Sequence, residues 1–326
     1  MCSADALGGG EVHVRQLVEE LRRHGYDVAV AGRKGGPLRL DHELPLRNAL
    51  DFGSARRLRR IVREGRFDIV HAHLARDYPI AAAALLGLPG PRLILTRQLL
   101  HRVRWTPLYR RVDGWIATTA GIERSLGHLR PKRVAVIPNW VDTAKLPYRE
   151  RPIHNPFVVG LLGQVSPHKG HDEAIDAVRL LGTGFRLLVG GTGRDDYVAS
   201  LRDRSRGLPV EFPGFVETSG FLEAIDVLIL PSWEEPFGIV VLEAMAAGVN
   251  VVATNAGGPP AVLDQGRAGL LVPPRDPEAL AGAVRRLASD RDLARELARR
   301  ARQRVVEHYD IAQVVPRIVR FYDASS

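Results

Sequence analysis

The 326-residue sequence has little cysteine and no long apolar run, and each shortage excludes a class of protein. The single cysteine, Cys2, has no partner for an internal disulfide, which excludes a disulfide-stapled extracellular domain and fits a reducing compartment. The longest apolar stretch, at 79–88, is far shorter than the ~20 residues that a membrane-spanning helix needs. These absences predict a cytoplasmic protein.

Lysine is also scarce, because arginine supplies all but four of the 46 basic residues. Residues 1–155 contain 27 basic and 15 acidic side chains, a net charge of +12, and the remaining residues contain 19 and 22, a net charge of −3. This asymmetry predicts an anionic partner for the first half. The absence of a recognised nucleic-acid-binding module argues against nucleic acid. A genome that encodes arginine in place of lysine is the alternative explanation.

Short apolar runs alternate with amphipathic stretches along the whole chain, a pattern typical of parallel α/β sheets. The expected strands are 27–32, 68–73, 92–96, 114–119 and 133–138 in the first half and 157–163, 185–191, 210–212, 227–231, 250–254 and 269–272 in the second. The stretch at 143–156, rich in proline and charge, predicts a linker. We therefore expect two doubly wound, Rossmann-like domains, at 1–150 and 151–326, facing a cleft.

Ligands of such sheets bind beyond the carboxyl ends of the strands, where helix N-termini expose backbone amides. Four loops have suitable residues there: 8–11, 163–172, 190–196 and 231–238. The last loop leads into a helix that we expect to begin near Phe237. The free amides of its first turn attract an anion such as a diphosphate.

Two glutamates flank this predicted helix start, Glu235 in the loop and Glu243 about two turns inside the helix. A carboxylate repels phosphate, so both are expected to face neutral hydroxyl groups on either side of a diphosphate. A nucleotide-sugar offers this arrangement, with ribose on one side and hexose on the other. The alternative is that the acids only complement the helix dipole.

The segment EPFGIVVLEAMAAG at 235–248 resembles the signature of the family 4 retaining glycosyltransferases, which have the GT-B fold. Five further segments resemble the family in the same order: GGGEVHVRQLVEEL, DIVHAH, IPNWVDT, GQVSPHKGHDEAI and VEFPGFV with IDVLILPS. The resemblance covers nearly the whole chain. It implies transfer of a sugar from a nucleoside diphosphate-sugar of UDP or GDP type to a glycan or lipid-linked acceptor, with no metal or other cofactor.

The resemblance also implies roles for individual residues. Glu243 would bind the donor ribose, Glu235 the sugar hydroxyls, and Lys169 the leaving phosphate, where preorganised charge favours transfer. The remaining residues of the implied donor site are Gly8, Gly9 and Gly10 in the first loop, Gln164 in the phosphate segment, Phe215 and Val216 beside the base, and the amides of Phe237, Gly238 and Ile239.

Some positions depart from the family pattern. Gln164 replaces the usual arginine, and Gln98 replaces the histidine of the family's T-x-H segment on the acceptor side. Ala261 stands in the GG-x-P-E loop where glutamate is common. His73 and His101 are the nearby histidines that could take part, His73 as a catalytic residue and His101 on the acceptor side. For His73, a structural role at a strand end is the alternative.

The basic charge of the first half is concentrated where arginines stand beside apolar residues. The segment at 52–67 places five arginines (Arg56, Arg57, Arg59, Arg60 and Arg63) on one predicted helix. The segment at 98–111 mixes arginine with Trp105 and Tyr109. Such surfaces suit an anionic membrane, at ~1 kcal/mol for each arginine. We expect peripheral contact with the inner face of the membrane; a solvated arginine face is the alternative.

The function expected from these features is a retaining glycosyltransferase of cell-envelope polysaccharide or glycolipid synthesis. One alternative is a nucleotide-sugar epimerase of the same fold, which would share the donor site. Another is a non-catalytic donor-binding subunit, which Gln98 and Gln164 favour and the intact Glu235 and Lys169 oppose.

The first strand of the N-terminal domain is expected to be missing or shortened. A doubly wound sheet begins with a central strand that leads into the glycine-rich loop. Here only the seven residues at 1–7 precede that loop, and a strand alone needs about five. The sequence as given is therefore expected to start late. Separately, the last helix is expected to pack back on the N-terminal domain.

Overall fold

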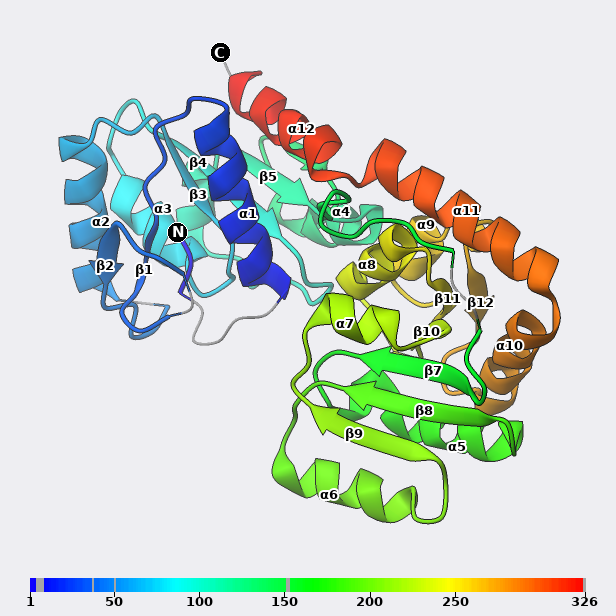
Figure 1. The fold of residues 1–326 in the computed structure, drawn as a ribbon. Coiled ribbons are helices and arrows are strands. Elements are labelled where there is room, and N and C mark those ends of the chain that lie inside the picture. Colours follow the sequence, from blue (N-terminus) through cyan, green and yellow to red (C-terminus); the bar gives the residue numbers. More distant parts are fainter. Residues whose placement is uncertain (4–8, 37, 50, 151–152, 325–326) are drawn as a thin grey trace. The chain divides into compact units, whose positions relative to one another are not determined.

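The computed structural model describes the chain except residues 4–8, 37, 50, 151–152 and 325–326, and it contains two compact units (Figure 1). Unit 1 comprises Met1–Asn139 and Val314–Ser326, and unit 2 comprises Trp140–Gln313. The chain thus divides after Asn139, before the expected boundary at 150, and most of helix α12 (Ile311–Asp323) belongs to unit 1.

Unit 2 is built on a parallel sheet of six strands in the order β9-β8-β7-β10-β11-β12. The strands are β7 (Phe157–Leu162), β8 (Phe185–Gly190), β9 (Val210–Gly214), β10 (Val227–Leu230), β11 (Asn250–Thr254) and β12 (Leu270–Val272). In chain order this is 3-2-1-4-5-6, the order of a doubly wound dinucleotide-binding sheet. The expected doubly wound domain is therefore confirmed for unit 2.

Helices cover both faces of the unit 2 sheet, because its central strands are apolar at every position. The helices are α5 (His171–Leu181), α6 (Asp195–Arg204), α7 (Thr218–Glu223), α8 (Ile239–Ala247), α9 (Pro259–Val262), α10 (Pro277–Ser289) and α11 (Arg291–His308), with short 3₁₀ turns η3 (Pro167–Lys169) and η4 (Asp264–Gly266). Alternate strand residues enter different cores: Leu228 packs with α7 and α8, whereas Val227 packs with α5 and α10.

Unit 1 divides its strands between two parallel sheets. The larger has the order β3-β4-β5-β6, and the smaller pairs β1 with β2. The strands are β1 (Ala31–Arg33), β2 (His42–Leu44), β3 (Ile69–Ala72), β4 (Arg92–Arg97), β5 (Gly114–Ala117) and β6 (Val134–Val136); the helices are α1 (Gly9–Arg23), α2 (Phe52–Glu64), α3 (Tyr78–Leu85) and α4 (Ala120–Leu126), with 3₁₀ turns η1 (Pro107–Arg111) and η2 (Gly127–Leu129).

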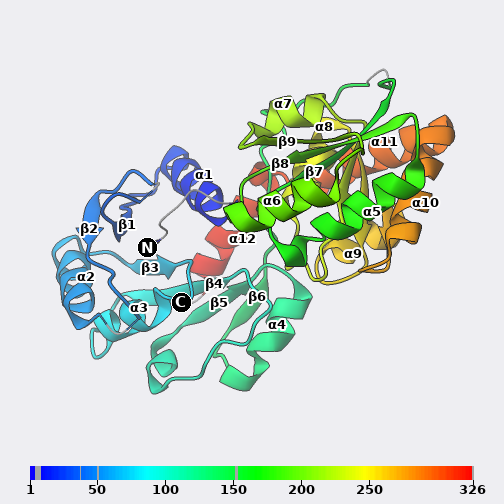
Figure 2. The same ribbon diagram turned by 90° about the horizontal axis from the view of Figure 1, so that it is seen from below.

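The first residues of the chain lie between these two sheets, as Figure 2 shows near the label N. Cys2 forms a parallel bridge with Gly32 of β1, and its N–H donates to the carbonyl of Ala31 at 3.0 Å. The amino group of Met1 donates to the carbonyl of His71 in β3 at 2.7 Å. A cavity of about 270 Å³ adjoins them, lined mostly by apolar side chains of α1, β1, α2 and β3, with His71, His73 and Tyr322 also in its wall.

Most expected strands are present within a few residues of their predicted limits. The largest difference is at 27–32, where only Ala31 and Gly32 belong to β1. Val30 just before the strand accepts hydrogen bonds from the Asp41 and His42 amides on one side. The short strand β2 was not predicted, because its His-Glu-Leu sequence has no apolar run. No helix or strand occupies the described residues of the expected linker at 143–156.

Candidate functional site

The central feature of unit 2 is an ion pair between Lys169 and Glu235, residues that the sequence separates by 66 positions. The Lys169 ammonium nitrogen lies 2.6 Å from Oε2 of Glu235. Lys169 ends η3, in the loop after β7, and Glu235 lies in the loop after β10. Since β7 and β10 are adjacent parallel strands, both loops emerge at the same carboxyl edge of the sheet. The Ser232 hydroxyl lies 3.4 Å from the same carboxylate oxygen.

Glycines fix the backbone of these two loops at very short separations. Gly170 has a φ of +75°, and a Cβ there would lie 2.1 Å from the carbonyl oxygen of Pro231. Beside it, the Trp233 N–H donates to the His168 carbonyl at 2.9 Å. Any side chain at Gly170 would therefore separate the loop of Lys169 from the loop of Glu235.

A third loop, after β11, supports the backbone of Glu235. The N–H of Gly258 donates to the Glu235 carbonyl at 2.7 Å. A Cβ on Gly257, which has a φ of +85°, would lie 2.0 Å from that same carbonyl oxygen. Only 8% of Glu235 is exposed. Its carboxylate is held by Lys169 and Ser232, and its backbone by the loop after β11. The GGPP segment, in which Ala261 departs from the family pattern, thus supports Glu235 through the backbone of its two glycines.

Helix α8 begins beside this ion pair, as predicted for a helix starting near Phe237. Gly238, at a φ of +90°, precedes its first residue, Ile239, and as the N-cap residue it has no side chain to cap the first turn. The Val241 N–H donates to the Gly238 carbonyl at 3.0 Å. The amides before it lie too early in the helix for an intrahelical partner and suit an anion. The side chain of Phe237 is buried in the core against Tyr309, so only its backbone belongs to the candidate site.

Glu243 lies in the middle of α8, and burial raises its pKa to about 7, with a further contribution from the charge of Glu217. Glu217 caps α7, where its carboxylate accepts from the Gly220 amide at 3.0 Å. Phe215 and Val216 come just before α7: Phe215 is 82% exposed, and Val216 packs against the core. The residues expected at the base and ribose thus lie in one region of unit 2.

Gln164 lies in a loop that is joined to the next glycine-rich loop. The Val165 N–H donates to the Thr192 carbonyl at 2.8 Å, and a Cβ on Gly191 would lie 1.8 Å from the Gly163 carbonyl. The Gln164 side chain is exposed beside these contacts. It is therefore accessible to a ligand at the carboxyl edge of β7.

In unit 1, two of the predicted site residues meet at the carboxyl edge of the sheet. Gly10 lies in the first turn of α1, and a Cβ there would be 3.1 Å from Oε1 of Gln98. Gly9 also belongs to α1, so the helix begins inside the predicted glycine-rich loop, whereas Gly8 lies outside the described residues. His101 exposes its side chain, and its carbonyl accepts from Arg97.

His73 follows β3 and lies against a second histidine that was not predicted. The two rings, of His71 and His73, have their centroids 4.1 Å apart. The nitrogens of His71 lie 2.6 Å from the Tyr322 hydroxyl and 2.7 Å from the Thr96 hydroxyl. Burial lowers the pKa of His71 to about 3 and that of His73 well below its usual value. Both imidazoles are therefore neutral at pH 7, as a proton acceptor requires.

Other residues near the ion pair were not predicted. The Trp233 indole N–H donates to Glu173 at 2.8 Å, and the Arg275 guanidinium lies 4.1 Å from the centre of the Trp233 ring. Trp233 could have been predicted as a site residue, because it lies in the same loop as Glu235. Nothing in the sequence marks Glu173 or Arg275 as a site residue, since only the tertiary fold brings them to Trp233.

Comparison with known proteins shows similarity to glycosyltransferases along nearly the whole chain. The models "Glycosyltransferase Family 4" and "Glycosyl transferases group 1" match residues 7–145 and 144–304. A glycogen synthase of Mycobacterium tuberculosis is 31% identical, over 81% of this chain and 70% of the relative. A phosphatidyl-myo-inositol mannosyltransferase of Mycolicibacterium smegmatis is 29% identical, over 99% of this chain and 92% of that relative.

Solved structures share the fold over nearly the whole chain. The Anabaena protein HepE in complex with UDP has a TM-score of 0.85 at 20% identity, covering 99% of this chain and 98% of its own. A glycosyltransferase from Rickettsia africae has a TM-score of 0.87 at 17% identity, covering 99% and 97%. These similarities confirm the GT-B fold class. The chain is a glycosyltransferase and belongs to family 4.

Proposed function

We propose that this glycosyltransferase takes a sugar from a nucleoside diphosphate donor and transfers it with retention of the anomeric configuration. The observation that carries the proposal is the Lys169–Glu235 ion pair at the uncapped start of α8. A diphosphate at these amides would find a cation beside it and carboxylates at Glu235 and Glu243 for the hydroxyls on either side. The HepE structure with UDP supports a donor of this class.

The ion pair suggests how the donor is used. In the structure Lys169 and Glu235 neutralise each other, and a bound diphosphate would compete for the ammonium group. Glu235 would then be free to accept hydrogen bonds from sugar hydroxyls. Lys169 would stabilise the negative charge that develops on the leaving phosphate, which is the main catalytic contribution expected in such a transfer.

We further propose a glycan or lipid-linked acceptor of the cell envelope, met at the inner face of an anionic membrane. The relatives include a phosphatidyl-myo-inositol mannosyltransferase and a lipopolysaccharide core glycosyltransferase. None of the helices in the described part of the chain combines the length and apolar composition needed to cross a membrane. Contact would therefore be peripheral and would involve the basic face of unit 1.

Helix α2 offers that face. Its exposed residues include Phe52, which is 73% exposed, and the arginines Arg56, Arg57, Arg60 and Arg63, with one exposed acid, Glu64, at its end. Arg59 is different, because its guanidinium donates to the carbonyls of Ala84 and Leu86 at 3.0 and 2.8 Å. Four of the five predicted arginines are thus available for anionic headgroups, and the fifth has a structural role.

A two-step experiment tests the proposed activity. Thermal shift and calorimetry with UDP, GDP and ADP identify the nucleotide, and release of that nucleotide from its sugar is then followed with and without a membrane extract containing acceptors. We expect release that depends on the acceptor. Conversion of the free donor sugar without acceptor would establish the epimerase alternative, and tight binding without any turnover would establish the non-catalytic subunit.

A further inference from the structure

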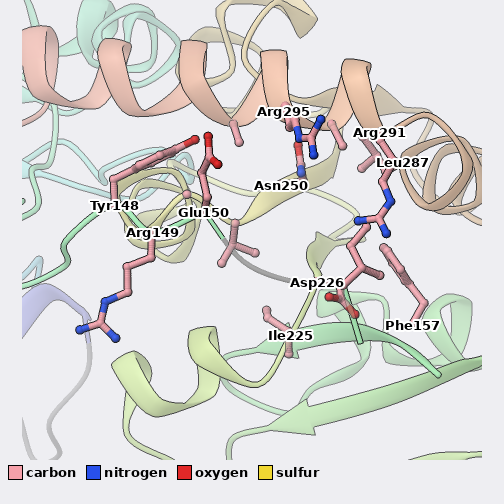
Figure 3. A pocket seen from close by; sticks show the side chains of 15 residues that line it. Tyr148, Arg149, Glu150, Phe157, Ile225, Asp226, Asn250, Leu287, Arg291 and Arg295 are labelled. Carbon is pink, nitrogen blue, oxygen red and sulfur yellow. The ribbon is translucent and has the colours of Figure 1, made fainter. Parts of the chain in front are cut away.

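The two ends of the sheet in unit 2 differ in how closely their loops are joined. At the amino ends of β7, β10 and β11 a second cavity, of about 130 Å³, remains among Phe157, Asp226 and Asn250 (Figure 3). At the carboxyl ends, main-chain hydrogen bonds and close glycine contacts join the loops that follow β7, β10 and β11. Trp233 lies where these loops meet, so its surroundings determine how firmly they are held.

The main chain of Trp233 bonds to the loop that carries Lys169. The Trp233 N–H donates to the carbonyl of His168, the residue directly before Lys169, at 2.9 Å. The preceding residue, Ser232, bonds to β11, because its carbonyl accepts from the Thr254 hydroxyl at 2.7 Å. A displaced Trp233 would therefore move the main chain beside Lys169.

The Trp233 side chain is held by two residues from other loops. Its indole N–H donates to Oε1 of Glu173, in the first turn of α5, at 2.8 Å. Oε2 of Glu173 is buried and accepts no hydrogen bond from the described residues, so the indole bond is the contact that ties this carboxylate to the loop after β10.

Arg275, in the loop after β12, covers the Trp233 ring. Its guanidinium lies 4.1 Å from the centre of the ring, within the range of a cation–π contact. The φ of Arg275 is +60°, a left-handed conformation that costs free energy for this residue and persists where surrounding contacts maintain it. Elements that follow β7, β10 and β12 thus meet at one indole.

We propose that Trp233 is a positioning residue for sugar transfer, whose indole, fixed by Glu173 and Arg275, holds Lys169 where charge develops on the leaving phosphate. The inference rests on the proposed role of Lys169. A diphosphate can still attract a lysine whose loop has shifted, because the side chain is long and flexible. Stabilisation of the transition state requires a fixed charge, and misplacement by about 1 Å can lower a rate by about 10²-fold. Loosening Trp233 should therefore lower kcat far more than it raises KM.

Trp233→Phe tests the proposal, because it keeps an aromatic ring and deletes the indole N–H. Tyr197→Phe is the matched control: the Tyr197 hydroxyl donates to Asp172, also in the first turn of α5, at 2.7 Å. Each variant removes one hydrogen bond from an aromatic side chain to a carboxylate of the same turn. We expect similar thermal unfolding of the two variants, but a fall in kcat of about tenfold in Trp233→Phe alone, with KM for the donor changed by less than about twofold.

Transfer is measured on the full chain with a membrane extract that contains acceptors. Release of nucleoside diphosphate is followed from UDP-glucose, GDP-mannose and ADP-glucose, and the donor that the unchanged chain uses fastest serves for all variants. Glu173→Ala should lower kcat as Trp233→Phe does. Glu173→Gln should lower it less, because it keeps an acceptor oxygen for the indole. Equal values of kcat in Glu173→Ala and the unchanged chain would contradict the proposal.

A double variant separates this inference from the proposed role of Lys169. In a chain that carries Lys169→Ala, Trp233→Phe should cause no further loss of kcat, since it acts through the absent ammonium group. An unchanged rate in Lys169→Ala alone would refute the role of Lys169 and the inference with it. A lowered rate in Lys169→Ala that falls about tenfold further with Trp233→Phe, or equal losses of kcat in Trp233→Phe and Tyr197→Phe, would overturn the inference alone.

Discussion

The two units build their sheets in different ways. In unit 2 six parallel strands form one sheet, and strand residues such as Val227 and Leu228 are completely buried on its two faces. In unit 1 the strands are split between two sheets, and a cavity of about 270 Å³ lies beside the residues that bridge them. Empty space beside apolar side chains costs free energy because these side chains lose contacts. We therefore expect unit 1, which has the larger cavity, to open before unit 2.

The largest expected effect tests the candidate site of unit 2. Lys169→Ala should lower transfer by about 10²–10³-fold and also weaken nucleoside diphosphate binding, because a preorganised charge is lost. Glu235→Ala should lower turnover but leave affinity for the bare diphosphate nearly unchanged. Calorimetry with the diphosphate and a transfer assay measure both, with Lys145→Ala as an exposed control. Equal losses of diphosphate affinity in the two variants would refute this division of roles.

A change of pH should alter the folding stability of the two units in opposite directions, through Glu243 in unit 2 and His71 in unit 1. The pKa of Glu243 is raised from 4.5 to about 7, so its protonated form stabilises unit 2 at low pH and this contribution is lost as the pH rises through 7. The pKa of His71 is lowered from 6.5 to about 3, so its neutral form favours the folded unit 1 above pH 6.5 and this contribution is lost as the pH falls toward 3.

Glu243→Gln tests the unit 2 half of that prediction. At pH 8 it should stabilise the protein by up to about 3 kcal/mol, because the buried charge is removed. The gain should vanish below pH 4.5, and nucleotide affinity should fall at every pH if Glu243 binds ribose. Chemical denaturation at pH 4, 6 and 8 provides the readout. A stability change that does not vary with pH would contradict the raised pKa.

A matched pair of substitutions sharpens the packing comparison. Ala31 lies in β1 beside the larger cavity, and Ala253 lies in β11 within the closed core of unit 2. Ala31→Val should be neutral or stabilising by about 1 kcal/mol, since it adds a buried group where space exists. Ala253→Val should destabilise by roughly 1–3 kcal/mol through overpacking. Destabilisation by both, measured by denaturant unfolding, would mean that the cavity cannot accept a side chain.

The smallest expected effect concerns the basic face of unit 1. Arg60→Ala should weaken binding to phosphatidylglycerol vesicles by about fivefold at low salt, since one arginine near an anionic surface contributes ~1 kcal/mol. Added salt should reduce binding further. Arg300→Ala in unit 2 is the control for general charge. If sedimentation shows equal losses for both variants, the contact is not specific to α2.

Part of the candidate site could be predicted from the sequence, because a glycine before an apolar helix and acids around it are local signals that point to Glu235. Lys169 followed only from the family resemblance, and the structure brings these two residues to 2.6 Å. The hydrogen bonds of His71 to Thr96 and Tyr322 could not be foreseen, since they join positions far apart in the chain. The raised pKa of Glu243 also depends on tertiary burial, which helix periodicity does not give.

The fold shows the same division between local and long-range information. Every strand of unit 2 was predicted, because most of them are short apolar runs bounded by glycine, proline or charge. In unit 1 the pattern at 27–32 predicted a longer strand than β1, since a pattern cannot show whether a neighbouring strand is present to pair with it. The short strand β2 depends on pairing with β1 and carries no pattern of its own.

The glycines that support Glu235 have a consequence for how this enzyme can change over evolution. A side chain at Gly170 or Gly257 would collide with main-chain atoms, so these positions have almost no mutational freedom. Gln164 and Phe215 are exposed, and substitutions there cost little folding free energy. New donor preferences should therefore arise by change at Gln164 and Phe215, while the ion pair stays where the three loops hold it.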